Sequence, residues 1–353
     1  MADFNKLPPE EQGRAFSQAA ARKGWAAPSV EKDYWVCITL GHLFAMPELE
    51  GHLTFKGGTS LSKAWGLIDR FSEDIDLTIG RELLGFGGKD SPEHAPSSKQ
   101  MHRRLADLRK DAAHFVQGRV LPSLRDRISR DLAQQDWSLE LDPDDPDQQT
   151  ILFNYPSRFE DNATRYLRPR VKIEFGARSD PWPAVQRPIQ PIIAELFPKL
   201  EIAPVQVQVL APERTFWEKA MLLHEERFRP ADKARRGRMA RHYYDLYSLI
   251  GHGVARAAAA DLTLFEQVAA HRRVFFRQTW VDYATLHPAT LDVLPTEEQV
   301  DEWRKDYAAM RAEMFSTEPP AFDLILQRVR DFQDAFRLGF SAAGDQAAIG
   351  PGG

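Results

Sequence analysis

Two aspartates that flank a single apolar residue constrain this chain more than any other feature of its sequence. Asp74 and Asp76 begin the pattern Asp-Ile-Asp-Leu-Thr-Ile, which alternates polar and apolar residues as a half-buried strand does. Because successive side chains of a strand point to opposite faces, the two carboxylates project to the same face. Like charges at this spacing repel unless they share a cation, and carboxylate oxygens suit Mg²⁺. The pair therefore predicts a magnesium site.

A glycine turn precedes the two aspartates, with fifteen residues between its second glycine and the first aspartate. The strand predicted at 53–56 ends in this turn, where the lack of side chains lets the backbone approach a ligand closely. Peptide N–H groups that open the following helix form an anion site, and a hydroxyl and a lysine add to it. In-line nucleotidyl transfer with two metal ions requires such a phosphate site beside carboxylates. The predicted phosphate-binding residues are Gly57, Gly58, Thr59, Ser60 and Lys63.

Composition excludes several classes of protein. The chain has 353 residues, a net charge of −5 and one cysteine, so a surface that binds nucleic acid throughout and an intrachain disulfide are both excluded. We interpret Cys37, in an apolar segment, as a buried structural thiol. No apolar run is long enough to span a bilayer, and the N-terminus lacks a signal-peptide pattern. We expect a cytoplasmic protein that does not contact a membrane.

Residue periodicity predicts a mixed α/β first part that is followed by helices. We place an N-cap at Ser29 and interpret Glu31, Lys32 and Asp33 as the solvated start of a helix. The strand at 205–210 alternates strictly and is predicted to be an edge strand. The predicted helices of this part are 7–24, 29–46 and 99–132, the last of them bent or interrupted at Pro122. The other predicted strands are 53–56, 72–79, 137–141, 151–155 and 170–175.

Two helices of the second part carry unusual charges. On the helix predicted at 213–227, Lys219 shares a face with large apolar residues, so an anion must meet it, either a carboxylate or a bound phosphate. On the next helix, Asp245 lies one turn beyond Arg241, and the two form either a local ion pair or part of a site. The basic run between these helices, 227–241, is predicted to face RNA or a triphosphate, with a solvated loop as the alternative.

The motifs resemble those of a known family. The glycine turn and the Arg-Phe-Ser-Glu-Asp-Ile-Asp-Leu string at 70–77 closely resemble the first motif of AbiEii/AbiGii-type nucleotidyltransferase toxins, a branch of the polymerase β-like nucleotidyltransferase superfamily. Phe-Trp-Glu-Lys at 216–219 and Arg-His-Tyr-Tyr-Asp at 241–245 resemble its second and third motifs, in the same order. The resemblance covers roughly residues 28 to 335.

This resemblance implies a fold and roles for single residues. The expected architecture is a polymerase β-like domain with a small mixed sheet at 1–208, a helical bundle at 209–340 and a disordered tail at 341–353. By resemblance, Lys219 and Arg241 contact the nucleotide phosphates and Asp245 completes the polar site. Enzymes of this superfamily place a third carboxylate on a later strand, for which Glu174 is the candidate; pairing with Lys172 or an arginine is the alternative. Either Glu174 or Asp245 would act as the base.

The resemblance also implies a function. We expect a Mg²⁺-dependent nucleotidyltransferase toxin of a bacterial toxin–antitoxin or phage-defence system, which transfers NMP from an NTP to an RNA acceptor such as the tRNA 3′ end. A separate antitoxin protein is the expected partner. Two alternatives stay open: nucleotidyl or phosphoryl transfer onto a protein, including the antitoxin, and a non-catalytic module that binds a nucleotide or RNA.

Overall fold

A computed structural model describes residue 4 and residues 7–132, 136–159, 168–200, 202–315 and 317–348 of the chain. The chain divides into two compact units, which we describe separately. Unit 1 comprises Met1–Gly66 and Phe71–Leu210, and unit 2 comprises Leu67–Arg70 and Ala211–Gly353. The main division thus follows Leu210, two residues after the predicted boundary, and a four-residue segment that precedes the aspartate motif belongs to unit 2.

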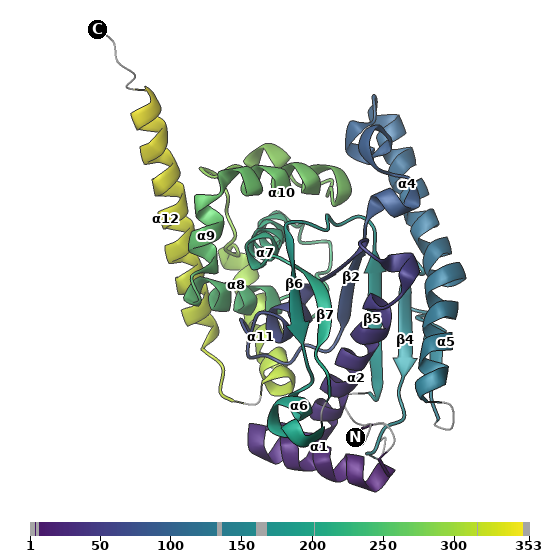
Figure 1. Cartoon of the computed structure of the whole chain (residues 1–353). Coiled ribbons are helices and arrows are strands. Elements are labelled where there is room, and N and C mark those ends of the chain that lie inside the picture. The colour runs from purple at the N-terminus through teal and green to yellow at the C-terminus, as the bar shows by residue number, and fades with distance from the viewer. Residues whose placement is uncertain are drawn as a thin grey trace. The chain divides into compact units, whose positions relative to one another are not determined.

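Unit 1 is built on one mixed sheet of seven strands, in the order β3-β4-β5-β2-β1-β7-β6 (Figure 1). The β2–β5 and β1–β7 pairs are parallel and the other pairs are antiparallel. The predicted mixed α/β class is therefore confirmed. The strands are β1 (Leu53–Lys56), β2 (Ile75–Ile79), β3 (Ser138–Leu141), β4 (Thr150–Asn154), β5 (Arg170–Gly176), β6 (Ala184–Ile189) and β7 (Val205–Leu210).

The prediction that β7 is an edge strand is wrong, because β6 pairs with it along its whole length. The sequence pattern did not predict β6, because its polar and apolar residues do not alternate. Pro183 precedes this strand and Pro188 lies within it. Proline lacks the N–H that a central strand needs, and it is tolerated at a sheet edge. The exposed strand at this edge is therefore β6.

Helices cover the sheet of unit 1, and one of them begins with buried charges. The N-cap of α2 is Ala26 rather than Ser29, and the expected solvated start is wrong, because Glu31 is fully buried and Lys32 and Asp33 nearly so. The surrounding α2 residues are apolar on every side, as is typical of a buried helix. The helices of unit 1 are α1 (Pro9–Lys23), α2 (Ala27–Phe44), α3 (Gly57–Lys63), α4 (Ser98–Phe115), α5 (Leu121–Asp131) and α6 (Ile192–Leu196).

The helix predicted at 99–132 forms one long column beside β4 (Figure 1). A π-helical turn at Val116–Val120 interrupts it before the predicted point, and Pro122 lies in the first turn of α5. A proline is tolerated in a first turn because its missing N–H has no helical partner there. The apolar side of the column, which includes Val116 and Ile128, joins the core of the sheet.

Unit 2 is helical, and its core is aromatic. Trp217 contacts the rings of Phe216, Phe265 and Phe336, which come from three different helices. The helices are α7 (Pro212–Arg227), α8 (Arg241–Gly251), α9 (Val254–Ala260), α10 (Leu262–Phe275), α11 (Glu297–Met314) and α12 (Phe322–Ala348). Across the described part of the chain, no helix combines the length and apolar character of a membrane span.

The last helix extends into the segment predicted to be a disordered tail. Residues 341–348 belong to α12, and residues 349–353 lie outside the described residues. Four of these eight helical residues are alanine, the residue with the highest helix propensity, which composition-based reasoning about small residues overlooked.

Candidate active site

The two aspartates of unit 1 lie where β2 begins. Asp76 is on the strand, while Asp74 immediately precedes it, so the ordered strand is shorter than the predicted 72–79. Ile75 and Leu77 are buried in the core, which directs Asp76 to the other face of the sheet. On the neighbouring parallel strand β5, Glu174 is the register partner of Asp76. The structure thus brings the predicted third carboxylate beside the pair.

Gly57 lies against one of these carboxylates. Its φ of +78° is strained for any residue with a side chain, and a Cβ at this position would lie 2.0 Å from Oδ2 of Asp76. On the antiparallel strand β1, Lys56 is the register partner of Asp76, so its side chain lies on the same face. The glycine turn and the aspartate motif therefore form one local site, which also includes a lysine that sequence reasoning missed.

The carboxylates of this group repel one another. Burial and the charges of Asp76, Glu73 and Glu174 together raise the pKa of Asp74 to about 6, against the opposing charge of Lys32. In the described residues, no group of three or more His, Cys, Asp or Glu side chains is arranged to hold a metal ion. Mg²⁺ typically uses one or two carboxylates and completes its shell with water and substrate phosphates. The open carboxylate group beside a glycine turn fits such an ion.

Glu174 also has the partner that the alternative interpretation proposed. Its Oε1 lies 2.8 Å from Nζ of Lys172 on the same strand, and about half of its side chain is exposed. Burial lowers the pKa of Lys172, but the hydrogen bond to Glu174 and the charges of Glu174, Asp74 and Asp142 together outweigh burial, and the net shift is upward. Glu174 therefore combines a salt bridge with a position next to Asp76.

The polar side chains of the glycine turn are occupied within unit 1. The hydroxyl of Thr59 lies 2.5 Å from the carbonyl oxygen of Asp74, and the hydroxyl of Ser60 donates to the carbonyl of Gly57. Nζ of Lys63 lies 2.7 Å from Oδ1 of Asp33, and both side chains are buried. These side chains hold the turn in shape. Phosphate binding at the turn would rely on backbone N–H groups, including that of Gly58.

The buried charges of α2 support the same turn, which the sequence did not reveal. Lys32 forms a 2.5 Å ion pair with Glu73, the residue before Asp74. Glu31 accepts hydrogen bonds from the Ser157 hydroxyl and the Arg158 backbone N–H. The available signal was the apolar character of α2 on all sides, which indicates that charges within it are buried and paired.

In unit 2, Asp245 is held by two cations. Its two oxygens lie 2.7 Å from Nε and 2.8 Å from Nη2 of Arg70, and Oδ2 lies 2.8 Å from Nζ of Lys219. Burial alone would raise the pKa of Asp245, but the two cations hold it well below its usual range. The partner of Asp245 is thus Arg70, 175 residues away, and the local pair with Arg241 does not form.

Lys219 lies in a cluster with excess positive charge. Besides Asp245, it contacts Nδ1 of His242 at 3.4 Å. Burial and the charges of Lys219 and Arg241 hold the pKa of His242 well below its usual value, so its ring is neutral. With three cations and one carboxylate, the cluster of Arg70, Lys219, Arg241, His242 and Asp245 has a net charge of about +2. Such a cluster attracts an anion.

The pKa of Lys219 reflects these neighbours. Burial lowers it, the carboxylate of Asp245 opposes that effect, and the charges of Arg70 and Arg241 lower it again, so the net shift is downward. An ammonium has three N–H donors, of which the neighbours described here accept two. Within the described residues, Arg241 makes no ion pair. The cluster therefore keeps donors for a ligand.

The basic run at 227–241 is used mainly within unit 2. Arg229 and Arg235 both pair with Glu226, and Arg227 pairs with Asp292. Cations of this run also lie over the rings of Trp280 and Trp303. Because these side chains already have carboxylates and rings as partners, the expected RNA-facing role of this run is not supported.

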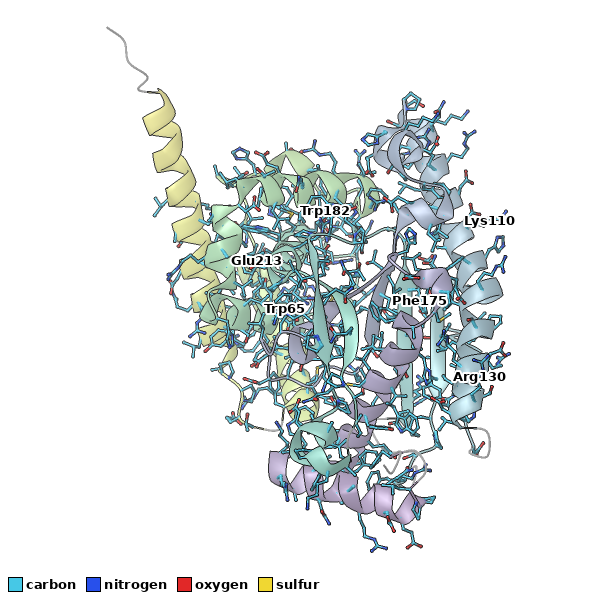
Figure 2. The ribbon with its side chains drawn as sticks, in the orientation of Figure 1. Trp65, Lys110, Arg130, Phe175, Trp182 and Glu213 are labelled. Atoms are coloured by element: carbon cyan, nitrogen blue, oxygen red, sulfur yellow. The ribbon has the colours of Figure 1, made fainter. Side chains whose placement is uncertain are left out.

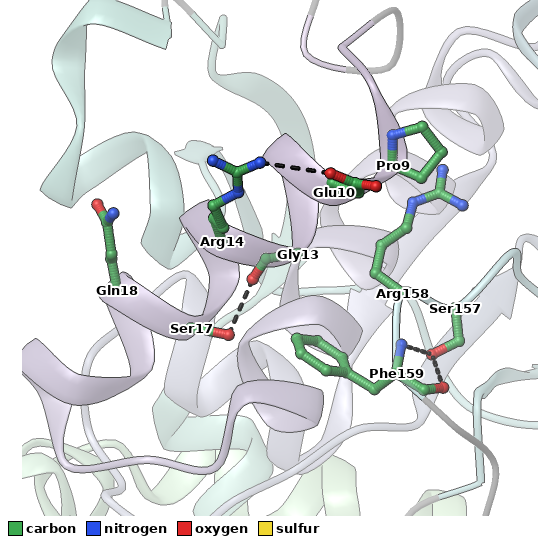
Figure 3. A pocket seen from close by; sticks show the side chains of 9 residues that line it. All are labelled: Pro9, Glu10, Gly13, Arg14, Ser17, Gln18, Ser157, Arg158 and Phe159. Carbon is green, nitrogen blue, oxygen red and sulfur yellow. Dashed lines mark hydrogen bonds and ion pairs between the residues drawn. The ribbon is translucent and has the colours of Figure 1, made fainter.

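An open depression in unit 1 holds none of the predicted site residues (Figure 3). It lies between α1 and residues 157–159, and its lining residues include the exposed Glu10–Arg14 pair. The guanidinium of Arg158 donates to the side chain of Gln12, a buried residue of α1. We assign no ligand to this depression.

The comparison with protein families agrees with the motifs. The family model described as "Nucleotidyl transferase AbiEii toxin, Type IV TA system" matches residues 39–337. Among solved structures, MenT4, a nucleotidyltransferase toxin from Mycobacterium tuberculosis H37Rv, is similar with 16% identity and a TM-score of 0.40, over 94% of this chain and 99% of that chain. A search of the curated proteins finds no match. Because the family model spans most of the chain, this protein belongs to the AbiEii nucleotidyltransferase toxins of type IV toxin–antitoxin systems and is an NTP-dependent nucleotidyltransferase.

Proposed function

We propose that the protein transfers NMP from an NTP to an RNA acceptor, the 3′ end of tRNA, with Mg²⁺ as cofactor. The observation that carries this proposal is the contact of the glycine turn with the aspartate motif, in which Asp76 occupies the space a side chain at Gly57 would need. A backbone anion site and a group of carboxylates then share one place.

Asp74 and Asp76 would hold the metal. Bound there, Mg²⁺ would neutralise charge on the phosphates and orient them for in-line displacement. Lys32 and Lys63 would act indirectly, because their ion pairs with Glu73 and Asp33 fix the residues on either side of the site.

Glu174 is the better candidate for the base. Both oxygens of Asp245 already accept hydrogen bonds from cations, and its pKa lies well below its usual range, so it is a poor proton acceptor. Glu174 is half-exposed and next to Asp76 in register. We therefore assign the base to Glu174 and a positioning role to Asp245.

The cationic cluster of unit 2 would bind the triphosphate through Lys219 and Arg241. Its excess positive charge supports this role. In the sequence, Arg70 of this cluster precedes Asp74 by only four residues.

The test is a transfer assay in which each of the four α-³²P-labelled NTPs is incubated in turn with the protein, total tRNA and candidate proteins. We expect label on tRNA in the presence of Mg²⁺, and none with Asp76→Asn or Lys219→Gln. Lys305→Gln, which changes an exposed lysine of unit 2, is the control and should label as the wild type does.

The position of the label decides between acceptors. Label on a protein, including the antitoxin that the type IV family implies, would replace the RNA proposal with protein modification. Label that persists in Asp76→Asn would refute the assigned site. For the biological setting, we propose that a separate antitoxin counteracts the toxin in a cytoplasmic phage-defence system. Loss of growth inhibition in Asp76→Asn would support the toxin role.

A further inference from the structure

The helical column of unit 1 has a charge opposite to that of the whole protein. Residues 98–131 contain nine lysines and arginines and four aspartates, a net charge of +5, whereas the whole chain has a net charge of −5. The remaining residues, with 37 basic and 47 acidic side chains, therefore have a net charge of −10. A local basic segment in an acidic chain is the charge asymmetry that indicates a polyanionic partner.

Five cations of this column are exposed and form neither an ion pair nor a side-chain hydrogen bond among the residues that the structure describes. By contrast, Arg109 pairs with Asp147, and Arg104, Arg125 and Arg127 donate to backbone carbonyls of neighbouring segments. Figure 2 labels two of the exposed cations, Lys110 on α4 and Arg130 on α5, both on the outer side of the column. We call these five residues the α4–α5 basic face: Lys99, Arg103, Lys110, Arg119 and Arg130.

The column presents this face rigidly. Leu108, Val116, Leu124 and Ile128 are buried on its other side, so the column cannot turn without exposing them. The π-helical turn joins α4 to α5 without a loop, since the two flanking caps are also helical. At a rise of about 1.5 Å per residue, the 34 residues extend over about 50 Å. This length suits a partner with many regularly spaced anionic groups.

We propose that the α4–α5 basic face binds the phosphate backbone of the RNA acceptor. This inference rests on the proposed function, because it supplies the docking surface for the polymer whose end is modified. Phosphate contacts position a nucleic acid and contribute most of its sequence-independent affinity. A membrane surface fits less well, because none of the large hydrophobic residues exposed in the described structure lies within residues 98–131, and interfacial helices need such residues.

The test measures RNA binding by a variant with three reversed charges, Lys99→Glu/Arg103→Glu/Lys110→Glu. Fluorescence anisotropy with labelled total tRNA, at several KCl concentrations, gives the affinity and its salt dependence. We expect the variant to lose at least ten-fold in affinity and its log–log salt slope to fall by about 2, since each lost phosphate contact removes about 0.7 to 0.9. Its affinity for free NTP, measured without RNA, should not change.

The matched control is Arg256→Glu/Lys305→Glu/Arg330→Glu, which makes the same change of net charge at exposed residues of unit 2. It should bind tRNA within about two-fold of the wild type. The neutral variant Lys99→Gln/Arg103→Gln/Lys110→Gln should show a smaller loss and a similar fall in slope. A thermal melt on each variant verifies folding, which we expect because all six changed positions are exposed.

The outcomes separate this inference from the proposed function. If the wild type labels tRNA and the reversed variant binds and labels it equally well, the basic face is not the docking surface, although the RNA acceptor stands. An equal loss in the unit 2 control would also overturn the inference, because net charge alone would then explain it. If the wild type binds no tRNA and labels a protein, the RNA acceptor and this inference both fail. Binding to anionic vesicles without affinity for tRNA would overturn the inference in favour of a membrane.

Discussion

Replacement of Arg70 by glutamine tests how the cationic cluster of unit 2 works. Arg70 donates two buried hydrogen bonds to Asp245, whose Oδ2 is also shared with Lys219. In Arg70→Gln, one positive charge is lost and Lys219 becomes the main partner of the carboxylate. The net charge of the cluster falls from about +2 to about +1, and the pKa of Lys219 rises because a repelling cation is gone. The cluster should therefore bind a triphosphate less well.

The expected magnitudes follow from the contacts. Breaking a buried ion pair by removing one partner costs about 3–5 kcal/mol, and the remaining bond from Lys219 to Asp245 places Arg70→Gln near the lower end. For the nucleotide, one unit charge about 10 Å from an anion contributes about 1.7 kcal/mol at an effective dielectric constant of about 20. This corresponds to a loss of about 15-fold in NTP affinity.

A second buried pair of the same kind provides the control. Arg272 donates to both oxygens of Glu225, at 2.9 and 2.6 Å, within the same unit. Arg272→Gln should lower the free energy of unfolding by a similar 3–5 kcal/mol in urea denaturation, without changing NTP affinity measured by calorimetry. In Arg70→Gln, the alkaline limb of the activity–pH profile should also move to higher pH. Arg70→Lys, which restores the charge without the two-pronged bond, should recover part of the NTP affinity.

The reasoning is refuted if the two glutamine variants lose equal stability and retain equal NTP affinity and the same pH profile. Arg70 would then be a structural residue only. An unchanged free energy of unfolding in Arg70→Gln would instead show that the bond to Asp245 does not form in solution.

Three further perturbations address unit 1. Gly57→Ala should lower the free energy of unfolding by about 2–4 kcal/mol and abolish transfer, because it combines backbone strain with a clash against Asp76. The control is Gly66→Ala, at a glycine that also has a positive φ but open space around it. It should lower the free energy of unfolding by only about 1–2 kcal/mol in the same denaturation assay. Mn²⁺ affinity, measured by calorimetry, should fall as the pH drops below about 6, because Asp74 then takes up a proton; a flat profile from pH 5 to 8 would contradict this. Thr59→Val removes the hydrogen bond to the Asp74 carbonyl and should lower the free energy of unfolding by about 1–3 kcal/mol. Mn²⁺ should also bind more weakly to this variant. Unchanged Mn²⁺ binding would show that the turn does not position the carboxylate.

Local patterns in the sequence determined the helices and strands whose apolar residues recur with a regular period. The alternation around Asp76 identified a strand with a polar face, and apolar spacing identified helices such as α7 and the interrupted column at 98–131. The motifs also predicted the family, which the family match confirms. In these cases one segment contains the whole signal, because periodicity depends only on neighbouring residues.

Only the tertiary structure decided which charges meet. Asp245 pairs with Arg70 across 175 residues of sequence rather than with Arg241 one turn away, and Lys63 pairs with Asp33. The edge position of β6 was equally invisible, because it depends on which strand pairs beyond β7. Such pairings are set by the packing of distant segments, which places a buried charge beside partners that offset its loss of hydration. The sequence therefore identified the candidate residues, and the fold assigned their partners.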